Sequence, residues 1–368
     1  MAERPPRVLF AIGSLSRGGS ERQLIQLVSA AHPDRIEAVI LTFSSVCDPG
    51  HAALLRDLGV DLVQVSPARG PRALRPLASV PRALRVLQQV KPDLAYPWLE
   101  EASATIAPAA GALGIPLVIA RRSVCGAPSE KWAPFRAAIH WAEKRAIRVT
   151  GNSCAVIEEA VGRGIPRERL RLVRNGHPPV NPLSPPNGSE VVLGYLANYR
   201  AEKGHRRLLD ALELIESETP WRVDLAGAGP LREQVGSEIA ERGLGGRVAA
   251  AGPISDVRGF WARRDVAVLL SDDEGSPNAL IEAAMLGRPL VGTDGGGTRE
   301  IVAPDGGLLV SHEPHEIAAA LGRLIDDREL RLALGRGARR HAVEQHDLER
   351  SVAGHVGVIK EALEARLA

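Results

Sequence analysis

The sequence predicts an α/β protein with two doubly wound domains, each built on a parallel sheet with helices on both faces. Short runs rich in valine, leucine and isoleucine alternate with helical patterns along the whole chain, and this alternation is typical of parallel sheets. With 368 residues the chain is long for one hydrophobic core and sufficient for two domains. A proline-rich stretch near its middle can continue neither a helix nor a central strand.

The individual elements follow from these patterns. In the first half, strands are expected at residues 7–12, 38–41, 61–65, 94–96 and 117–120, and helices at residues 20–31, 52–58, 82–90 and 134–147. In the second half, strands are expected at residues 191–196, 222–226, 248–251, 266–270, 290–292 and 308–310. Ligands of doubly wound sheets bind beyond the carboxyl ends of the strands, so the segments that follow the strands are the candidate binding loops.

The proline-rich stretch at residues 178–188 is predicted to link the two domains. The first domain is therefore expected to comprise residues 1–177, and the second residues 189–345, with the two domains facing each other across a cleft. Residues 346–368 are expected to form a C-terminal helix that crosses back to the first domain.

Composition narrows the class of protein. A net charge of +2 and an aromatic content of 3% argue against a nucleic-acid partner. The three cysteines lack metal-ligand spacing and are expected to be reduced thiols. The chain shows no signal-peptide pattern and no apolar run of about 18 residues, so a cytoplasmic protein is expected.

The most informative motif is Glu274-Gly-Ser-Pro-Asn-Ala-Leu-Ile-Glu282, which spans an expected loop-to-helix junction. Ser276 is expected to cap the helix, Pro277 suits its first position, and Gly287 should end it. A helix start offers unpaired N–H groups and a positive dipole end, which together suit a phosphate group. A diphosphate seated there would have a carboxylate on either side, as a nucleotide-sugar site requires.

The alternative interpretation of this motif is two surface glutamates near a helix start, where acidic residues are favoured. The neighbouring sequence favours the binding site. A second glycine loop, beginning at Asp294, follows the next strand and opens another helix. Arg200 and Lys203 follow the first strand of the second domain, where they are placed to neutralise a diphosphate leaving group. An ordinary charged loop is the alternative there, but Lys203 is one of only five lysines in the chain.

Two other motifs give weaker signals. Gly227-Ala-Gly229-Pro230 is better explained as a tight strand–helix turn than as a dinucleotide fingerprint, because proline breaks that pattern. The adjacent acids 272–274 do not share one face of an extended chain, so no metal site is expected there.

In the first domain, Gly18 and Gly19 join the first strand to the first helix and let the backbone approach a ligand closely. A plain strand–helix turn is the alternative. Residues 67–92 carry several arginines and Lys91 but no acidic residue, with leucine and valine interleaved. This basic amphipathic segment is either a solvated surface or a site of peripheral contact with an anionic membrane at its inner face.

Taken together, these residues resemble glycosyltransferase family 4, whose members have the two-domain GT-B fold. The resemblance covers nearly the whole chain, and the Glu-x7-Glu element is its most specific part. The motifs that carry it are Gly18-Gly19-Ser-Glu21, Gly151-Asn152-Ser153, Asn175-Gly176, Lys203-Gly204, Gly227-Ala-Gly229-Pro230, Gly252-Pro-Ile254, Glu274…Glu282 and Gly296-Gly297…Glu300.

The family transfers a sugar from a nucleotide donor with retention of anomeric configuration. It needs no bound metal, so neither a metal nor a cofactor is expected beside the donor. By resemblance, Glu274 contacts the hydroxyls of the donor sugar, Glu282 holds the ribose, and Arg200 and Lys203 grip the diphosphate. The helix start at Ser276, Pro277 and Asn278, the backbone at Gly252 and Ile254, and the glycine pair Gly18 and Gly19 complete the expected donor site.

Two departures from the family pattern concern the charged residues. Many members carry an arginine five residues before the lysine, where this chain has Asn198. Many also carry a histidine after the fifth strand of the first domain, where this chain has Arg121 and Arg122. These two arginines are the expected first-domain or acceptor-side residues. Either Arg122 takes over the role in a subgroup with its own acceptor, or the first-domain site is altered.

The sequence therefore predicts a retaining glycosyltransferase of the hexosyltransferase type that uses a nucleotide diphosphate sugar, with UDP as the expected nucleotide. The expected acceptor is a glycan or a lipid-linked sugar in surface polysaccharide, lipopolysaccharide or glycolipid assembly. Two alternatives stay open: a sugar-nucleotide epimerase of the same fold, with His177 and His205 as the motif-adjacent histidines, and a degenerate member that only binds nucleotide.

Overall fold

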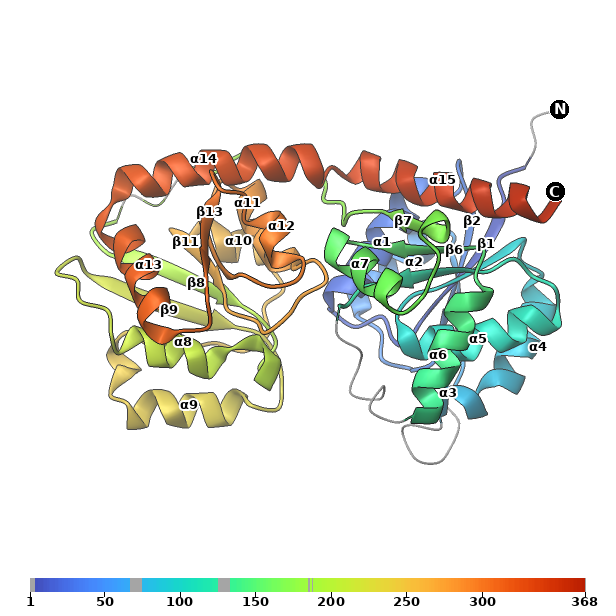
Figure 1. The fold of residues 1–368 in the computed structure, drawn as a ribbon, viewed down its shortest axis with the longest axis horizontal. Coiled ribbons are helices and arrows are strands. Elements are labelled where there is room, and N and C mark those ends of the chain that lie inside the picture. The colour runs from blue at the N-terminus through green and yellow to red at the C-terminus, as the bar shows by residue number, and fades with distance from the viewer. Residues whose placement is uncertain (1–3, 67–74, 125–132, 185, 187, 368) are drawn as a thin grey trace. The chain divides into compact units, whose positions relative to one another are not determined.

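The computed structural model describes residues 4–66, 75–124, 133–184, 186 and 188–367, and it is α/β throughout (Figure 1). The chain divides into two compact units, of which the first combines Met1–Gly176 with Leu348–Ala368 and the second is His177–Asp347. The final helix α15 (Leu348–Leu367) thus returns to the first unit and packs against α1 (Gly19–Ala31). This return of the C-terminal helix agrees with the sequence-based prediction.

Within its described residues, the first unit contains two parallel ladders in the orders β3-β2-β1-β4 and β5-β6-β7. Isolated parallel bridges, Ala95↔Leu117 and Trp98↔Ala120, join the two ladders between β4 and β5. All of these strands therefore end at the same edge. The strands are β1 (Arg7–Ile12), β2 (Glu37–Thr42), β3 (Asp61–Gln64), β4 (Leu94–Pro97), β5 (Val118–Arg121), β6 (Arg148–Gly151) and β7 (Leu170–Leu172).

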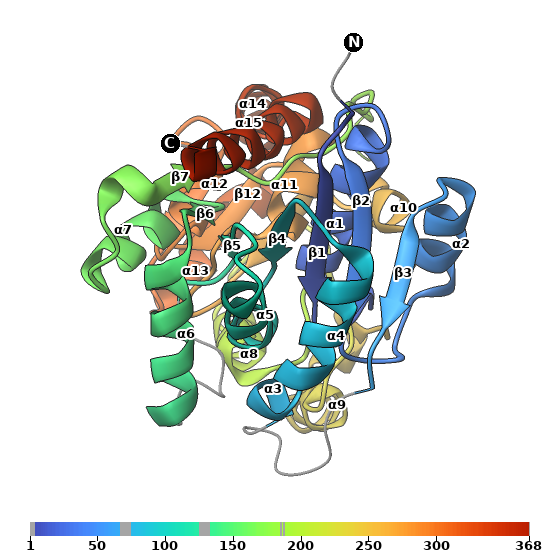
Figure 2. The same ribbon diagram turned by 90° about the vertical axis from the view of Figure 1, so that its right-hand side faces the viewer.

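Alternating residues of β1 build two cores on opposite faces of this sheet, as the period of a strand requires. Phe10 packs with residues of α1 and α15, whereas Leu9 packs with residues of α4 and α5. Figure 2 shows α4, α5 and α6 side by side on the second of these faces. The remaining helices of the unit are α2 (Pro49–Asp57), α3 (Arg75–Ala78), α4 (Val80–Val90), α5 (Glu100–Ala112), α6 (Ala133–Arg145) and α7 (Cys154–Gly162).

The second unit has one parallel sheet in the order β10-β9-β8-β11-β12-β13. Chain order runs outward from β8 in one direction and from β11 in the other, so the topological switch point lies between these two strands. Ligands of open α/β sheets bind at such a point, beyond the carboxyl ends of the strands. The strands are β8 (Val191–Leu196), β9 (Trp221–Ala226), β10 (Val248–Ala250), β11 (Val266–Leu269), β12 (Leu290–Thr293) and β13 (Gly307–Val310).

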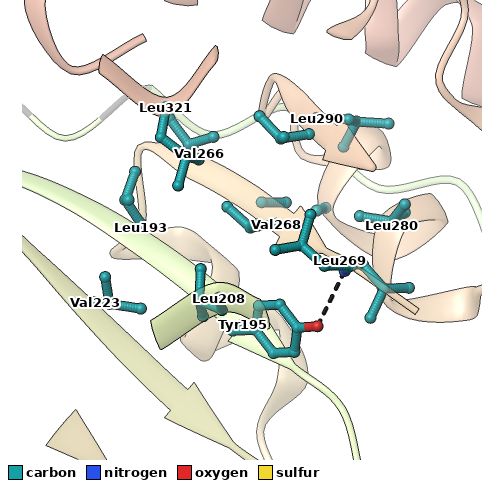
Figure 3. Close-up of a cluster of buried hydrophobic side chains, with 14 of the residues drawn as sticks. Leu193, Tyr195, Leu208, Val223, Val266, Val268, Leu269, Leu280, Leu290 and Leu321 are labelled. Atoms are coloured by element: carbon teal, nitrogen blue, oxygen red, sulfur yellow. Dashed lines mark hydrogen bonds between the residues drawn. The ribbon is translucent and has the colours of Figure 1, made fainter. Parts of the chain in front are cut away.

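The core of this unit contains aliphatic side chains from β8, β9 and β11 together with helix residues such as Leu208 and Leu280 (Figure 3). The phenol of Tyr195, at the end of β8, accepts a hydrogen bond from the backbone N–H of Leu270 (3.0 Å), drawn as the dashed line in Figure 3. The helices are α8 (His205–Leu212), α9 (Arg232–Glu241), α10 (Val257–Ala262), α11 (Asn278–Met285), α12 (Thr298–Ile301), α13 (Pro314–Asp326) and α14 (Arg328–Gln345).

The structure corrects one local prediction at the central motif. The N-cap of α11 is Pro277, and the helix begins at Asn278, so Ser276 is not the capping residue and Pro277 is not the first helical residue. The cause is that Pro277 takes an extended backbone conformation, with φ −71° and ψ 101°, one residue later than expected. The predicted end of the helix is confirmed, because Gly287 has φ +78°, the left-handed conformation that closes a helix.

Candidate active site

Three loops meet at the carboxyl edge of the sheet in the second unit, on either side of the switch point. They follow β8, β11 and β12. The backbone N–H of Asp272 donates to the carbonyl of Glu202 (2.8 Å), and the N–H of Gly297 donates to the carbonyl of Glu274 (2.7 Å). The loop after β11 is therefore fixed to both of its neighbours by main-chain hydrogen bonds.

The side chains of Lys203 and Glu274 form an ion pair at this junction, although 71 residues separate them in sequence. Their side chains are 21% and 16% exposed, respectively, so the pair is partly shielded from water and still reachable. The Ser271 hydroxyl donates to the same Glu274 oxygen (2.8 Å). An ammonium group has three donors, so the Lys203 Nζ retains donors for phosphate oxygens while it holds the carboxylate. Sequence reasoning placed both residues at the site, and the structure brings them together.

Two residues that sequence reasoning missed hold this loop. Arg207, in the first turn of α8, donates to the Leu270 carbonyl and, through Nη2, to Asp272 (2.7 Å). The buried hydroxyl of Thr293, the last residue of β12, donates to the carbonyl of Ser271. A polar residue directly after the predicted central strand at residues 290–292 is the sequence signal that could have identified Thr293.

Glycine is required where these loops cross. Gly204 has φ +67°, and a Cβ there would lie 2.0 Å from the carbonyl oxygen of Leu270. Gly296 has φ +48°, and its Cβ would lie 2.4 Å from the Glu274 carbonyl oxygen. Both distances are far below van der Waals contact with backbone atoms, so neither position accepts a side chain without a shift of the loop that carries Glu274.

We expect Gly204→Ala to lower the free energy of unfolding by about 3 kcal/mol, because it combines a left-handed backbone with a clash against Leu270. Gly243→Ala is the matched control, since Gly243 has φ +68° and nothing within 4 Å of its Cβ position. Gly243→Ala should lower the free energy of unfolding by only about 1 kcal/mol. Denaturant unfolding of both variants measures the difference. Equal losses of stability in the two variants would contradict the conclusion that the Gly204 backbone is packed too closely against Leu270 to accept a side chain.

The start of α11 lies directly after this loop. The first amides of a helix have no carbonyl acceptors within the helix, and they carry its positive dipole end. Glu282 stands four residues after Asn278, on the same face of α11 and half-buried. The Asn278 Oδ1 lies 3.1 Å from the Nε2 of His177. The two glutamates of the motif therefore lie before and after the helix start.

The other expected residues of the second unit lie at the same edge. Arg200 is open to solvent, with 58% of its side chain exposed, and its guanidinium is 3.9 Å from Glu202. Gly252 accepts a hydrogen bond from the N–H of Gly227 (3.2 Å), and Ile254 packs partly buried against the core. Gly227 has φ +152°, and a Cβ there would meet the Ala197 carbonyl oxygen at 1.9 Å, which fits the tight strand–helix turn predicted from the sequence.

His205 is a buried histidine in the first turn of α8, directly after the Lys203 loop. Its ring stacks on Tyr199, with 4.5 Å between ring centroids, and lies against Tyr195. Neither ring nitrogen has a hydrogen-bond partner among the described residues. Burial, assisted by the charge of Lys203, lowers the pKa of His205 to about 4.

This pKa predicts a loss of stability in acid. Between the unfolded value of 6.5 and the folded value of about 4 the unfolded chain binds more protons, so the free energy of unfolding falls as pH decreases. We expect the stability advantage of the native chain over His205→Phe to shrink by about 2 kcal/mol between about pH 7 and about pH 5. The other histidines titrate in both proteins, so their contributions cancel in the difference between the two free energies of unfolding. A pH-independent difference would show that His205 is not the buried neutral group described here.

In the first unit, Gly18 is the N-cap of α1 and Gly19 is its first residue. A Cβ on Gly18 would lie 2.1 Å from the Glu21 carboxylate, and the Ser16 hydroxyl also donates to that carboxylate (3.0 Å). The acid of the first helical turn therefore folds back over Gly18. A phosphate approaching this end of α1 would have to displace Glu21.

The expected arginines of the first unit follow one another and differ in surroundings. Arg121, the last residue of β5, is buried and forms ion pairs with Glu143 of α6 and Glu159 of α7. It therefore fastens these helices to the sheet. Arg122 lies on the opposite face of the strand and contacts Trp98 and Asn175 instead.

The described residues contain neither an evident metal-ion cluster nor a membrane-spanning helix. No group of three or more histidine, cysteine, aspartate and glutamate side chains is arranged to hold a metal ion there. Among the helices of the described residues, none combines the length and the apolar character that are needed to cross a membrane.

Two family models together match most of this chain. The family model described as "Glycosyltransferase Family 4" matches residues 17–179, and the model "Glycosyl transferases group 1" matches residues 183–341. The putative glycosyltransferase EpsF of Bacillus subtilis is 25% identical over 318 residues, covering 78% of this chain and 79% of EpsF. The lipopolysaccharide core biosynthesis glycosyltransferase LpsE of Rhizobium meliloti is 26% identical over 349 residues, covering 90% and 93%.

Among solved structures, HepE of Anabaena in complex with UDP and glucose superposes with a TM-score of 0.83, at 22% identity, over 97% of this chain and 100% of HepE. WaaG, a glycosyltransferase involved in lipopolysaccharide biosynthesis, superposes with a TM-score of 0.78, at 17% identity, over 96% and 99%. These likenesses concern the fold. Together with the two family models, they show that the chain is a glycosyltransferase of family 4 with the GT-B fold.

Proposed function

We propose that this glycosyltransferase moves a sugar, with retention of anomeric configuration, from a nucleotide diphosphate sugar to a hydroxyl of a glycan or lipid-linked acceptor. The observation that carries the proposal is the Lys203–Glu274 pair, which lies at the switch point of the sheet and beside the start of α11. A cation, a carboxylate and a helix N-terminus in one place suit a diphosphate attached to a hydroxyl-bearing sugar.

In this proposal the diphosphate sits on the first amides of α11 and contacts Lys203, with Arg200 reaching it from the solvent side. Glu274 accepts a hydrogen bond from a sugar hydroxyl, and Glu282 accepts hydrogen bonds from the ribose. As the bond between the sugar and the phosphate oxygen breaks, the growing negative charge on the diphosphate is stabilised by Lys203 and the amides. The acceptor oxygen bonds to the sugar on the same face, and its proton goes to the departing phosphate oxygen.

The comparisons support UDP as the nucleotide to test first, because HepE was solved with UDP and with UDP-glucose. Lipopolysaccharide or polysaccharide assembly is the proposed pathway class, because LpsE and WaaG are named for lipopolysaccharide biosynthesis. The epimerase alternative is less well supported, because the motif-adjacent histidines His177 and His205 are only 5% and 4% exposed, and the ring of His205 is stacked against two tyrosines.

We also propose that the protein contacts an anionic membrane surface peripherally, through charged side chains alone. Arg69 and Arg72 of the basic segment lie outside the described residues. On α4, the apolar residues Val86 and Leu87 are buried in the core, and Arg82 and Arg85 face solvent. The apolar face of α4 is therefore already occupied, and the exposed arginines are left to contact anionic headgroups.

The test measures thermal stabilisation by UDP, GDP, ADP and their sugars, since a ligand at about 100 times its Kd adds about 2.7 kcal/mol. Proton NMR of the product from the best donor then reports the anomeric configuration. Stabilisation by UDP and a product with the donor's configuration are expected. Inversion of configuration, or a changed sugar formed without acceptor, would refute the proposal.

A further inference from the structure

The two consecutive arginines at the end of β5 are both buried, but only the first of them is paired with carboxylates. Arg121 is 4% exposed and has two carboxylate partners, of which Glu143 is 1% exposed. Arg122 is 8% exposed, and within the described part of the chain no carboxylate lies within ion-pair distance of it. Burying an unpaired charge costs several kcal/mol, so proteins normally pair such a cation or bring a ligand to it.

Every described contact of Arg122 is with a neutral group. Its guanidinium lies over the ring of Trp98, 3.7 Å from the centroid. Nη1 donates to the Asn175 side-chain oxygen (2.9 Å), and Nη2 lies 3.4 Å from the Nε2 of His355. The Nε has no partner among the described residues. These contacts fix the plane of the guanidinium but leave its charge uncompensated.

The hydrogen bonds behind Arg122 run in one direction. Arginine can only donate, so the His355 Nε2 accepts and its Nδ1 carries the proton. Nδ1 therefore donates to the Tyr96 hydroxyl (2.8 Å), which donates in turn to Thr150 (3.0 Å). Burial and the charge of Arg122 both hold the pKa of His355 well below its usual value, so the ring stays neutral and cannot supply a competing charge.

Arg122 also keeps its charge. Burial lowers its pKa to about 10, which still leaves the guanidinium protonated near neutral pH. It follows β5, Trp98 follows β4, and Asn175 lies beyond β7. The charge therefore lies at the carboxyl edge of the first unit's sheet, where doubly wound domains bind ligands. Helix α15 contributes His355 from the end of the chain to this cluster.

We propose that Arg122 is an anion-binding residue that receives an anionic group of the acceptor, either a phosphate or a sugar carboxylate. The identity of the ligand rests on the proposed transfer to a glycan or lipid-linked acceptor, but the site itself can be tested without it. One N–H on each terminal nitrogen remains after the bonds to Asn175 and His355, and two such donors match the geometry of a carboxylate or a phosphate.

The probe is fluorine NMR of protein labelled with 5-fluorotryptophan, which gives signals for the five tryptophans. The Trp98 signal is assigned with Trp98→Phe. Inorganic phosphate and glucuronate are then titrated at constant ionic strength. A saturable shift of the Trp98 signal is expected, with a Kd on the order of 1 mM. Response to phosphate alone indicates a phosphate-bearing acceptor, and response to glucuronate alone indicates a carboxylate.

Arg122→Gln should weaken this response at least about tenfold. Arg56→Gln is the matched control, because it removes the same charge from an exposed position on α2 of the same unit, and it should leave the titration unchanged. If Arg122→Gln alters the other tryptophan signals and so the fold, Arg122→Lys decides. Lysine keeps the charge but loses the paired donors, and a Kd raised about threefold or more is expected.

No Trp98 shift with either anion, or an equal shift in the Arg122 variants, would overturn the proposal. UDP binding by the native chain is measured in parallel. A native chain that binds phosphate at Trp98 but not UDP would refute the proposed donor and leave the anion site standing. Binding of UDP without a Trp98 response to either anion would refute the anion site and leave the proposed donor standing.

Discussion

Lys203→Ala is expected to reduce the transfer rate by about 100-fold, which corresponds to the loss of one charged group that stabilises the leaving diphosphate. The backbone of the Lys203 loop is packed closely against Leu270 at Gly204, and the ion pair with Glu274 holds the ammonium at this loop crossing. UDP binding should weaken as well, because the same cation contacts the diphosphate before and during reaction. Steady-state kinetics and calorimetric titration with UDP measure the two effects.

Lys360→Ala provides the control for this change. Lys360 is an exposed lysine on α15, and its loss changes the net charge equally without touching the loops. It should have native kinetics. If Lys203→Ala keeps more than about one third of the native rate while Lys360→Ala is unaffected, Lys203 does not stabilise the leaving group.

Glu274→Gln is expected to lower the rate about 100-fold but to act on UDP binding in the opposite direction. The native carboxylate holds Lys203 in an ion pair and accepts from Ser271. Glutamine keeps the shape and removes the charge, so Lys203 is released toward the diphosphate. The Kd for UDP should therefore stay the same or decrease, while the turnover number falls.

This opposite behaviour separates a catalytic contact from a structural one. If Glu274 served only to hold its loop, Glu274→Gln would weaken UDP binding and lower the melting temperature together. A parallel loss of UDP affinity in Lys203→Ala and Glu274→Gln would therefore contradict the assignment of Glu274 to the sugar.

Much of this site could be predicted because parallel strands all end at one edge. Once Val191–Leu196 and Val266–Leu269 are recognised as neighbouring strands, Lys203 and Glu274 must lie beyond the same edge. Helix α5 was missed for a physical reason. Its residues from Ala102 to Ala107 are all buried, so the segment lacks the amphipathic period by which a surface helix is recognised.

Contacts between distant segments could not be predicted from local patterns. Arg121 and Arg122 are adjacent and chemically identical, and only the packing of α6 and α7 determines that Arg121 receives the carboxylates. His355 lies 233 residues after Arg122 in sequence, and no motif marks it. The prediction that Ser276 caps α11 is wrong, because Pro277 is extended and the helix therefore begins one residue later, at Asn278.

The crystal structure of the chain with UDP tests the central claim most directly. The expected result is a diphosphate on the amides that open α11, with Lys203 Nζ in contact with it and Glu282 at the ribose. A diphosphate bound away from the start of α11, with the Lys203–Glu274 pair undisturbed, would contradict the assigned donor site.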